Sequence, residues 1–136
     1  MATLAGHHAV VTGAGRGIGA AIAARLAADG APLTLMGRNA AVLEAAAATL
    51  PAAARARVVP CDVADAATVM QAFASARAGL GPVSILLNHA GHAESASFAE
   101  TTLDPWHRML ADNQTGPFLC TPAALVDVHA CGRGHI

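Results

Sequence analysis

The chain has 136 residues, enough for one domain at the usual size of roughly 100–200 residues. Eight basic residues, all Arg, oppose nine acidic ones, and the formal charge of −1 lacks the basic surplus that is typical of a nucleic-acid binder. No stretch approaches the ~18 consecutive apolar residues of a membrane span. Three scattered cysteines are too few for a disulfide framework or a zinc site, and the N-terminus lacks the pattern of a secretory signal. These features predict a soluble cytoplasmic α/β domain without nucleic-acid or membrane partners.

Short apolar runs alternate with alanine-rich stretches along the whole chain. The first run, residues 8–12, is predicted to be a strand and leads into a glycine-rich segment at residues 13–19. Ile18, Ile22 and Leu26 then recur every four residues, which predicts that they share one face of a helix.

Two further strand–helix pairs follow. Asn39 is placed to cap a helix after the run 33–36, and Asp65 is placed to cap another after the run 57–61. The spacing of apolar residues predicts the buried faces, which are Val42, Leu43, Ala46 and Leu50 in the first helix and Val69, Phe73 and Ala76 in the second.

The fourth run, residues 83–87, is the most apolar of all. A helix is predicted to begin after it at Thr102 or Asp104, and a further helical stretch reaches about His129. Residues 132–136 have the character of the approach to a fifth strand. Apolar side chains at helical spacing in this part of the chain are expected to pack into the core, and these are Trp106, Met109 and Leu110.

This alternating order predicts parallel strands joined by right-handed crossovers, with helices on both faces of the sheet. The fold class is therefore α/β, a doubly wound parallel sheet (Rossmann fold) in the order 3-2-1-4-5. Because the chain stops where the fifth strand would begin, we expect residues 1–136 to form an incomplete domain of this fold, truncated at about that point.

The segment Thr12–Gly19, with the sequence TGAGRGIG, lies between a predicted strand and a predicted helix. Glycines allow the backbone to turn sharply and to approach phosphate oxygens, and the helix N-terminus presents free N–H groups to an anion. Glycine-rich segments also serve ordinary turns. The position between strand and helix favours a nucleotide pyrophosphate site.

At this point the sequence resembles the short-chain dehydrogenase/reductase family. Residues 12–19 match the cofactor loop of that family, and Asp62 with Val63 matches the pair that holds the adenine ring. Residues 88–91 resemble its Asn-Asn-Ala-Gly signature, with His89 in place of the second Asn. The resemblance implies that cofactor binding falls to Gly13, Gly17, Ile18, Gly19, Asp62, Val63, Asn88, Ala90 and Gly91.

Asn113, followed by Gly116 and Phe118, matches the helix Asn that the family places in its catalytic tetrad. A helix-bending or capping Asn is the alternative. The family's catalytic Ser and Tyr-x-x-x-Lys pair would follow the fifth strand, and this chain contains neither Tyr nor Lys. Since carbonyl reduction needs a proton donor at the oxygen, we expect the 136-residue chain alone to be inactive.

The residues at the end of the second predicted strand help to distinguish an NAD-binding protein from an NADP-binding one. An NAD enzyme usually has an acid there, whereas this chain has Gly37 followed by Arg38. Arg38 would attract a 2′-phosphate that a carboxylate would repel, and Arg16 could approach the same phosphate. A solvated surface Arg is the alternative for each. Together they favour NADP over NAD.

The resemblance implies an oxidoreductase that transfers a hydride between NADP(H) and a small-molecule alcohol or carbonyl substrate. Its character is similar to bacterial members that act on 3-oxoacyl thioesters. The full-length parent is expected to be a homo-oligomer, and the isolated chain to self-associate. The alternatives are a non-catalytic nucleotide-binding module or remnant, and a product that does not fold stably alone. His89 and His92 have metal-ligand spacing but no evident third ligand, so no metal is expected.

Overall fold

The computed structural model describes residues 3–136. Its centre is a parallel sheet of four strands in the order β3-β2-β1-β4, as the sequence predicts. The third strand begins and ends one residue earlier than its predicted range. The strands are β1 (His8–Thr12), β2 (Leu33–Gly37), β3 (Ala56–Pro60) and β4 (Val83–Leu87).

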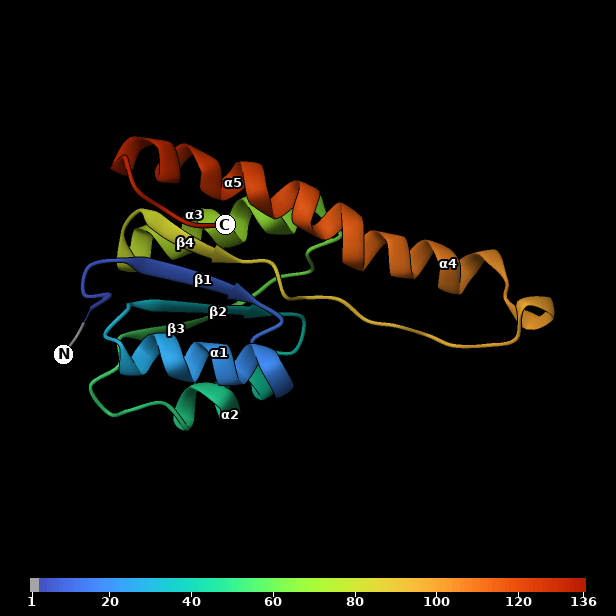
Figure 1. Ribbon diagram of the computed structural model, residues 1–136, viewed down its shortest axis with the longest axis horizontal. Helices are drawn as coiled ribbons and strands as arrows, with labels where there is room; N and C mark the ends of the chain where they lie inside the picture. Colours follow the sequence, from blue (N-terminus) through green and yellow to red (C-terminus); the bar gives the residue numbers. More distant parts are fainter. Residues whose placement is uncertain (1–2) are drawn as a thin grey trace.

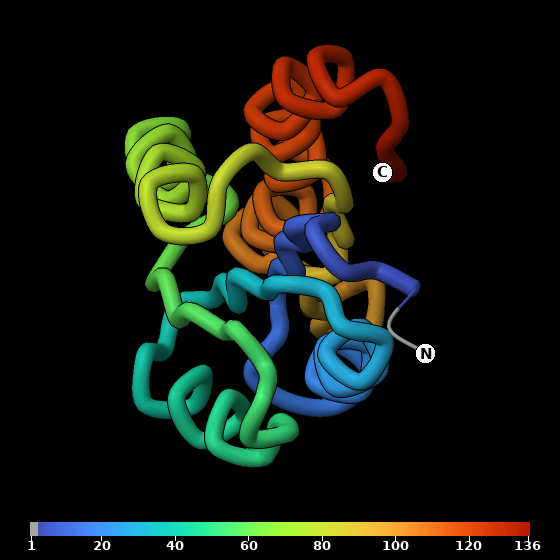
Figure 2. The backbone as a smooth tube through the Cα atoms, turned by 90° about the vertical axis from the view of Figure 1, so that its left-hand side faces the viewer, coloured from blue at the N-terminus to red at the C-terminus, as the bar shows by residue number. Residues whose placement is uncertain are grey.

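Helices cover both faces of this sheet, so the fold is doubly wound and Rossmann-like (Figure 1). Helices α1 and α2 lie on one face, and α3 and α5 lie on the other, which Figure 2 shows from the side. The helical elements are α1 (Gly17–Ala28), α2 (Ala40–Ala48), α3 (Ala66–Leu80), the 3₁₀ turn η1 (Phe98–Glu100), α4 (Leu103–Leu110), the π-helical segment η2 (Ala111–Thr115) and α5 (Gly116–Cys131).

The two faces of the sheet form two separate apolar cores. Because successive side chains of a strand point to opposite faces, Val10 packs with α3 and α5 while Val11 packs with α1 and α2. Phe73 of α3 is fully buried in the first core, and Leu43 of α2 is buried in the second. Parallel strands covered on both sides therefore show continuous apolar sequences.

Local capping explains where two of the helices begin. The Asn39 side chain accepts a hydrogen bond from the backbone N–H of Val42, and Asp65 accepts one from that of Thr68 at 2.9 Å. The predicted inward face of α3 is confirmed. In α2 only Leu43 is buried, because this short helix lies at the margin of the sheet and its other apolar residues remain partly exposed.

The buried face of α1 differs from the sequence-based expectation. Its buried residues are Gly19, Ala23 and Ala27, whereas Ile18 is 68% exposed and Ile22 and Leu26 are only half-buried. The small side chains allow the backbone of α1 to lie close to the sheet. The larger residues Ile18, Ile22 and Leu26 therefore lie beside the helix–sheet contact and not within it.

The expectation that Trp106, Met109 and Leu110 pack into the core is wrong. No residue of α4 is buried, and Trp106 is 52% exposed. Figure 1 shows that α4 and the segment before it extend beyond the end of the sheet, where no described element covers them. Helical spacing of apolar residues identifies a face but not the layer that buries it.

Residues after α5 return to the sheet beside β4. His135 forms a parallel bridge with Ile85, donates its backbone N–H to the carbonyl of Ser84 at 3.0 Å, and accepts from Leu86 at 2.9 Å. The predicted approach to a fifth strand is thus confirmed at this position. No helix within residues 3–136 has the length and apolar character needed to cross a membrane.

Candidate functional site

A pocket of about 350 Å³ lies at the carboxyl ends of the strands, where β1 and β2 lead into α1 and α2. This is the edge at which doubly wound sheets bind ligands, because the loops after the strands converge there. It combines the predicted glycine loop with the segments that follow β2, β3 and β4. The lining residues are Gly13, Gly15, Arg16, Gly37, Arg38, Asn39, Val42, Leu43, Cys61, Asp62, Val63, His89, Ala90, Gly91 and Asp112.

The loops after β1 and β4 are held together by Thr12. Its hydroxyl oxygen accepts hydrogen bonds from the backbone N–H groups of His89 and Ala90, each at 3.0 Å, and donates to the carbonyl of Leu87. Gly13 has a φ of +66°, and a Cβ atom there would lie 2.8 Å from the Cα of Ala90. Only glycine therefore allows these two loops to meet and form one wall of the pocket.

The first turn of α1 adjoins this wall. Arg16, the N-cap residue, makes no side-chain capping hydrogen bond, so the N–H groups of the first turn remain available to an anion. Gly17 has a φ of +57° with open space beside it, and Gly19 lies directly against the carbonyl of Gly13 and the ring of His89. This close approach fits a pyrophosphate seated between the glycine loop and the helix.

The segment after β3 forms the adjoining side of the pocket. Asp62 accepts a hydrogen bond from the backbone N–H of Ala64 at 3.0 Å, which fixes a tight turn, and its own carbonyl accepts from the hydroxyl of Thr68. Val63 packs against Gly116, where a Cβ atom would lie 2.7 Å from a Val63 methyl group. The turn places Asp62 and Val63 together at the pocket.

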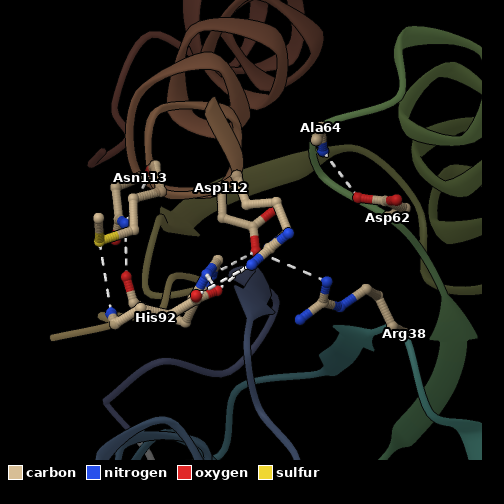
Figure 3. Close-up of polar contacts among 9 residues, drawn as sticks. Arg38, Asp62, Ala64, His92, Asp112 and Asn113 are labelled. Atoms are coloured by element: carbon tan, nitrogen blue, oxygen red, sulfur yellow. Dashed lines mark hydrogen bonds and ion pairs between the residues drawn. The ribbon is translucent and has the colours of Figure 1, made fainter. Parts of the chain in front are cut away.

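A chain of polar and charged side chains runs from the pocket to its rim (Figure 3). Asp112 lies 3.6 Å from the Arg38 guanidinium and 2.7 Å from Nδ1 of His92. The other ring nitrogen of His92 contacts Glu94, which accepts two hydrogen bonds from Arg108. The Arg108 hydrogen bonds lower the pKa of Glu94, and Glu94 in turn raises the pKa of Arg108.

Asn113 lies beside this network but does not line the pocket. Its side-chain amide donates to the carbonyl of His92 at 2.7 Å (Figure 3) and to that of Met109 at 2.8 Å. Its oxygen faces Gly91. Because Asn113 lies in the π-helical segment η2 and bonds to a carbonyl of the preceding turn, the helix-bending arrangement is present.

Seven of the predicted cofactor residues line the pocket together, namely Gly13, Arg16, Arg38, Asp62, Val63, Ala90 and Gly91. Gly17, Ile18 and Gly19 instead form the adjoining start of α1. Asn88 points toward α5, where its side chain donates to the hydroxyl of Thr121 at 3.1 Å. Asp112 was not predicted as a pocket residue, although its position next to Asn113 in the sequence indicates a place near the site.

Two thiols near the site are poorly suited to nucleophilic chemistry. Cys61 and Cys120 are buried in the same apolar core, and burial raises the pKa of both, that of Cys120 to about 12. Within residues 3–136, no group of three or more His, Cys, Asp or Glu side chains is arranged to hold a metal ion. The arrangement instead suits binding of a dinucleotide by backbone amides and a guanidinium.

The family model described as "short chain dehydrogenase" matches residues 7–136, which is nearly the whole chain. The chain belongs to this family. Members of the short chain dehydrogenase family bind a nicotinamide dinucleotide, and the glycine loop, the uncapped helix start and the Asp62 turn of this member fit such a cofactor.

Similarity to individual dehydrogenases extends over the same region. The chain is 44% identical over 133 residues to galactitol 2-dehydrogenase (L-tagatose-forming) of Cereibacter sphaeroides, covering 98% of this chain and 52% of that protein. A crystal structure of a dehydrogenase/reductase from Sinorhizobium meliloti superposes with a TM-score of 0.88 at 39% identity, over 93% of this chain and 51% of the other.

A further similar structure contains a cofactor. A blue fluorescent protein from a metagenomic library, solved in complex with NADPH, superposes with a TM-score of 0.80 at 40% identity, over 91% of this chain and 52% of the other. The chain spans about half the length of the relatives it matches.

Proposed function

We propose that residues 1–136 are the cofactor-binding domain of an oxidoreductase that prefers NADP(H) and interconverts an alcohol and a carbonyl compound. The single observation that carries the cofactor preference is Arg38, which follows β2 directly, lines the pocket and has a side chain that is 67% exposed. Gly37 stands before it, where an NAD enzyme usually has an acid.

Different residues of the pocket would bind different parts of the cofactor. Gly13 and the start of α1 would hold the pyrophosphate, Asp62 and Val63 the adenine ring, and Arg38, with Arg16 beside it, the 2′-phosphate. Ala90 and Gly91 complete the wall that Gly13 begins. When bound, the nicotinamide would supply or accept the hydride, and we assign Asn113 to the catalytic residues on its match to the family's helix Asn.

The substrate is proposed to be a small secondary alcohol or the corresponding carbonyl compound. The galactitol 2-dehydrogenase name supports sugar alcohols as first candidates, and 3-oxoacyl thioesters remain a second class to test. We propose a homo-oligomeric whole protein in the cytoplasm. Three free cysteines support this compartment, because disulfides form chiefly in oxidising ones.

The cofactor preference is tested by titrating NADPH and NADH separately into the purified chain by isothermal titration calorimetry. A charge-assisted contact to phosphate is worth roughly 1.5–3 kcal/mol, so we expect NADPH to bind about ten- to a hundredfold more tightly. Arg38→Ala should remove most of that preference. Arg55→Ala removes an exposed Arg outside the pocket and should preserve it. Equal affinities, or tighter NADH, would refute the proposal.

A further inference from the structure

The Arg38 guanidinium is already held by a carboxylate of the same pocket. Arg38 follows β2 and Asp112 belongs to η2, so the two side chains reach toward each other from elements that lie far apart in the sequence (Figure 3). Arg38 Nη1 lies 3.6 Å from Asp112 Oδ2, and both residues line the pocket together with Asp62 and Val63. The proposed phosphate-binding group therefore has an internal anionic partner.

Asp112 is the fixed member of this pair. Its side chain is 11% exposed, and the oxygen that faces Arg38 is also 2.7 Å from Nδ1 of His92. His92 is held in turn by Glu94 through its other ring nitrogen. If Arg38 swings away, Asp112 keeps the His92 hydrogen bond and is not left as an unpartnered buried charge. Arg38, which is largely exposed, is thus the member that can move.

We propose that Asp112 competes with the 2′-phosphate of NADP(H) for Arg38, and is thereby a further residue that determines cofactor affinity and preference. This inference rests on the proposed function, in which Arg38 binds that phosphate. In the free protein Arg38 pairs with Asp112. On binding NADP(H), Arg38 exchanges the carboxylate for the phosphate, while Asp112 remains with His92.

The exchange affects the two cofactors differently. NAD(H) carries a hydroxyl where NADP(H) carries a phosphate, so its binding does not require Arg38 to leave Asp112. The negative charge of Asp112 also opposes the doubly charged phosphate across the pocket. Removing this charge should therefore strengthen NADP(H) binding more than NAD(H) binding. If Asp112 instead oriented Arg38 for the phosphate, its removal would weaken NADP(H) binding.

The test is Asp112→Asn, which removes the charge and retains a side-chain oxygen that can accept from His92. Because Arg38 is largely exposed and the two charges are 3.6 Å apart, we take the pair to be worth about 1 kcal/mol, and we expect the Kd for NADPH to fall about two- to fivefold. The Kd for NADH should change less than about twofold. Glu44→Gln is the matched control, since it neutralises an exposed carboxylate of α2 outside the pocket and should leave both Kd values unchanged.

A double-mutant cycle identifies the partner through which Asp112 acts. In an Arg38→Ala background, Asp112→Asn should strengthen NADPH binding much less than in the parent chain, because the competing pair is already absent and only the direct repulsion between Asp112 and the phosphate remains to be removed. Circular dichroism and thermal unfolding establish that each variant is folded, and Asp112→Ser replaces Asp112→Asn if the latter unfolds. An unchanged or raised Kd for NADPH in the folded variant, or an equal gain in the Arg38→Ala background, overturns the inference.

The same titrations separate this inference from the proposed function. If the parent chain binds NADPH more tightly than NADH but Asp112→Asn binds NADPH no better, the competition is refuted and the cofactor proposal stands. If the parent chain binds too weakly to measure and only Asp112→Asn binds NADPH, the competition is supported. If neither protein binds either cofactor while both are folded, both proposals fail.

Discussion

At the scale of single residues, His8 is the most deeply buried histidine among the described residues, at 1% exposed. Its Nδ1 lies 2.8 Å from the carbonyl oxygen of Gly81, so this nitrogen carries the proton and donates it. The other ring nitrogen, 2.8 Å from the Thr34 hydroxyl, then accepts. The neutral ring therefore satisfies both neighbours, and burial lowers the pKa of His8 below its usual value.

This burial predicts acid sensitivity of the fold. In the unfolded chain His8 titrates near its ordinary pKa of about 6.5, whereas in the folded chain its pKa is lower. Between these two values the unfolded state binds more protons, so the free energy of unfolding decreases as the pH falls below about 6.5 and through the folded pKa. Urea unfolding followed between about pH 7.5 and pH 5 measures this decrease.

Two His→Gln variants test whether His8 causes this acid sensitivity. His8→Gln should flatten this part of the pH dependence, even though it lowers stability overall by disturbing a buried site. His129→Gln removes an exposed His of α5 and should leave the pH dependence as it is. A His8→Gln chain with the parent pH profile would show that another group causes the acid sensitivity.

At the scale of elements, Asp127 joins α5 to α3 and β4. One of its oxygens accepts from Arg77 Nε at 2.7 Å and from the backbone N–H of Val83 at 3.0 Å. Arg77 also donates to the carbonyl of Ala123 in α5. The Asp127 side chain is 13% exposed, so solvent replaces these bonds poorly if the carboxylate is removed.

We expect Asp127→Ala to lower the free energy of unfolding by about 1–3 kcal/mol, because the Val83 N–H and the Arg77 guanidinium both lose their acceptor. Asp127→Asn should cost less, since its amide oxygen can still accept from Val83. Glu44→Ala, on the exposed side of α2, should change the free energy by no more than about 0.5 kcal/mol. Chemical denaturation measures all three, and an equally stable Asp127→Ala chain would contradict this account of how α5 is anchored.

At the scale of the whole molecule, the edge of β4 that faces away from β1 is only partly covered. Among the described residues, His135 alone forms a bridge with that edge, at Ile85. The strand is apolar and carries no charge or proline, the combination that favours edge-to-edge association. Exposed apolar side chains add further uncovered surface, Phe118 and Val126 on α5 and Trp106 on α4.

The 136-residue chain is therefore predicted to self-associate rather than remain a compact monomer. Size-exclusion chromatography with light scattering, with and without NADPH, measures this directly. Cofactor at about a hundred times its dissociation constant adds only about 2.7 kcal/mol of stability, which shifts the balance toward the folded chain without covering the strand edge. A sharp monomeric peak without cofactor, combined with cooperative thermal unfolding, would show that the edge is already protected.

A protein of these 136 residues is also predicted to lack reductase activity. It contains no Tyr and no Lys, and the Asn113 amide cannot supply the proton that a carbonyl oxygen needs on reduction. NADPH consumption would be measured with small ketones, keto-sugars and 3-oxoacyl thioesters, using a heat-treated sample as the blank. Protein-dependent turnover that persists after repurification would contradict the prediction and would require a different proton donor, such as His89.

Much of the fold follows from local physical rules that the sequence displays. Buried parallel strands need continuous apolar runs, so all four strands could be predicted to within a residue. Asn39 and Asp65 cap their helices through hydrogen bonds that span only three residues, and these bonds depend little on the rest of the chain. The glycine loop was likewise predictable, because its backbone requirements are local.

The tertiary structure decided what depends on distances between elements. Whether Ile18 or Gly19 is buried depends on how closely α1 approaches the sheet, which the helical period does not specify. Trp106 is exposed because no described layer lies beneath α4, although its spacing resembles that of a core residue. Asp112 contacts Arg38 only because the end of β2 and the start of η2 both lie at the same pocket. A contact between segments so far apart in the chain has no periodic or local pattern in the sequence that would predict it.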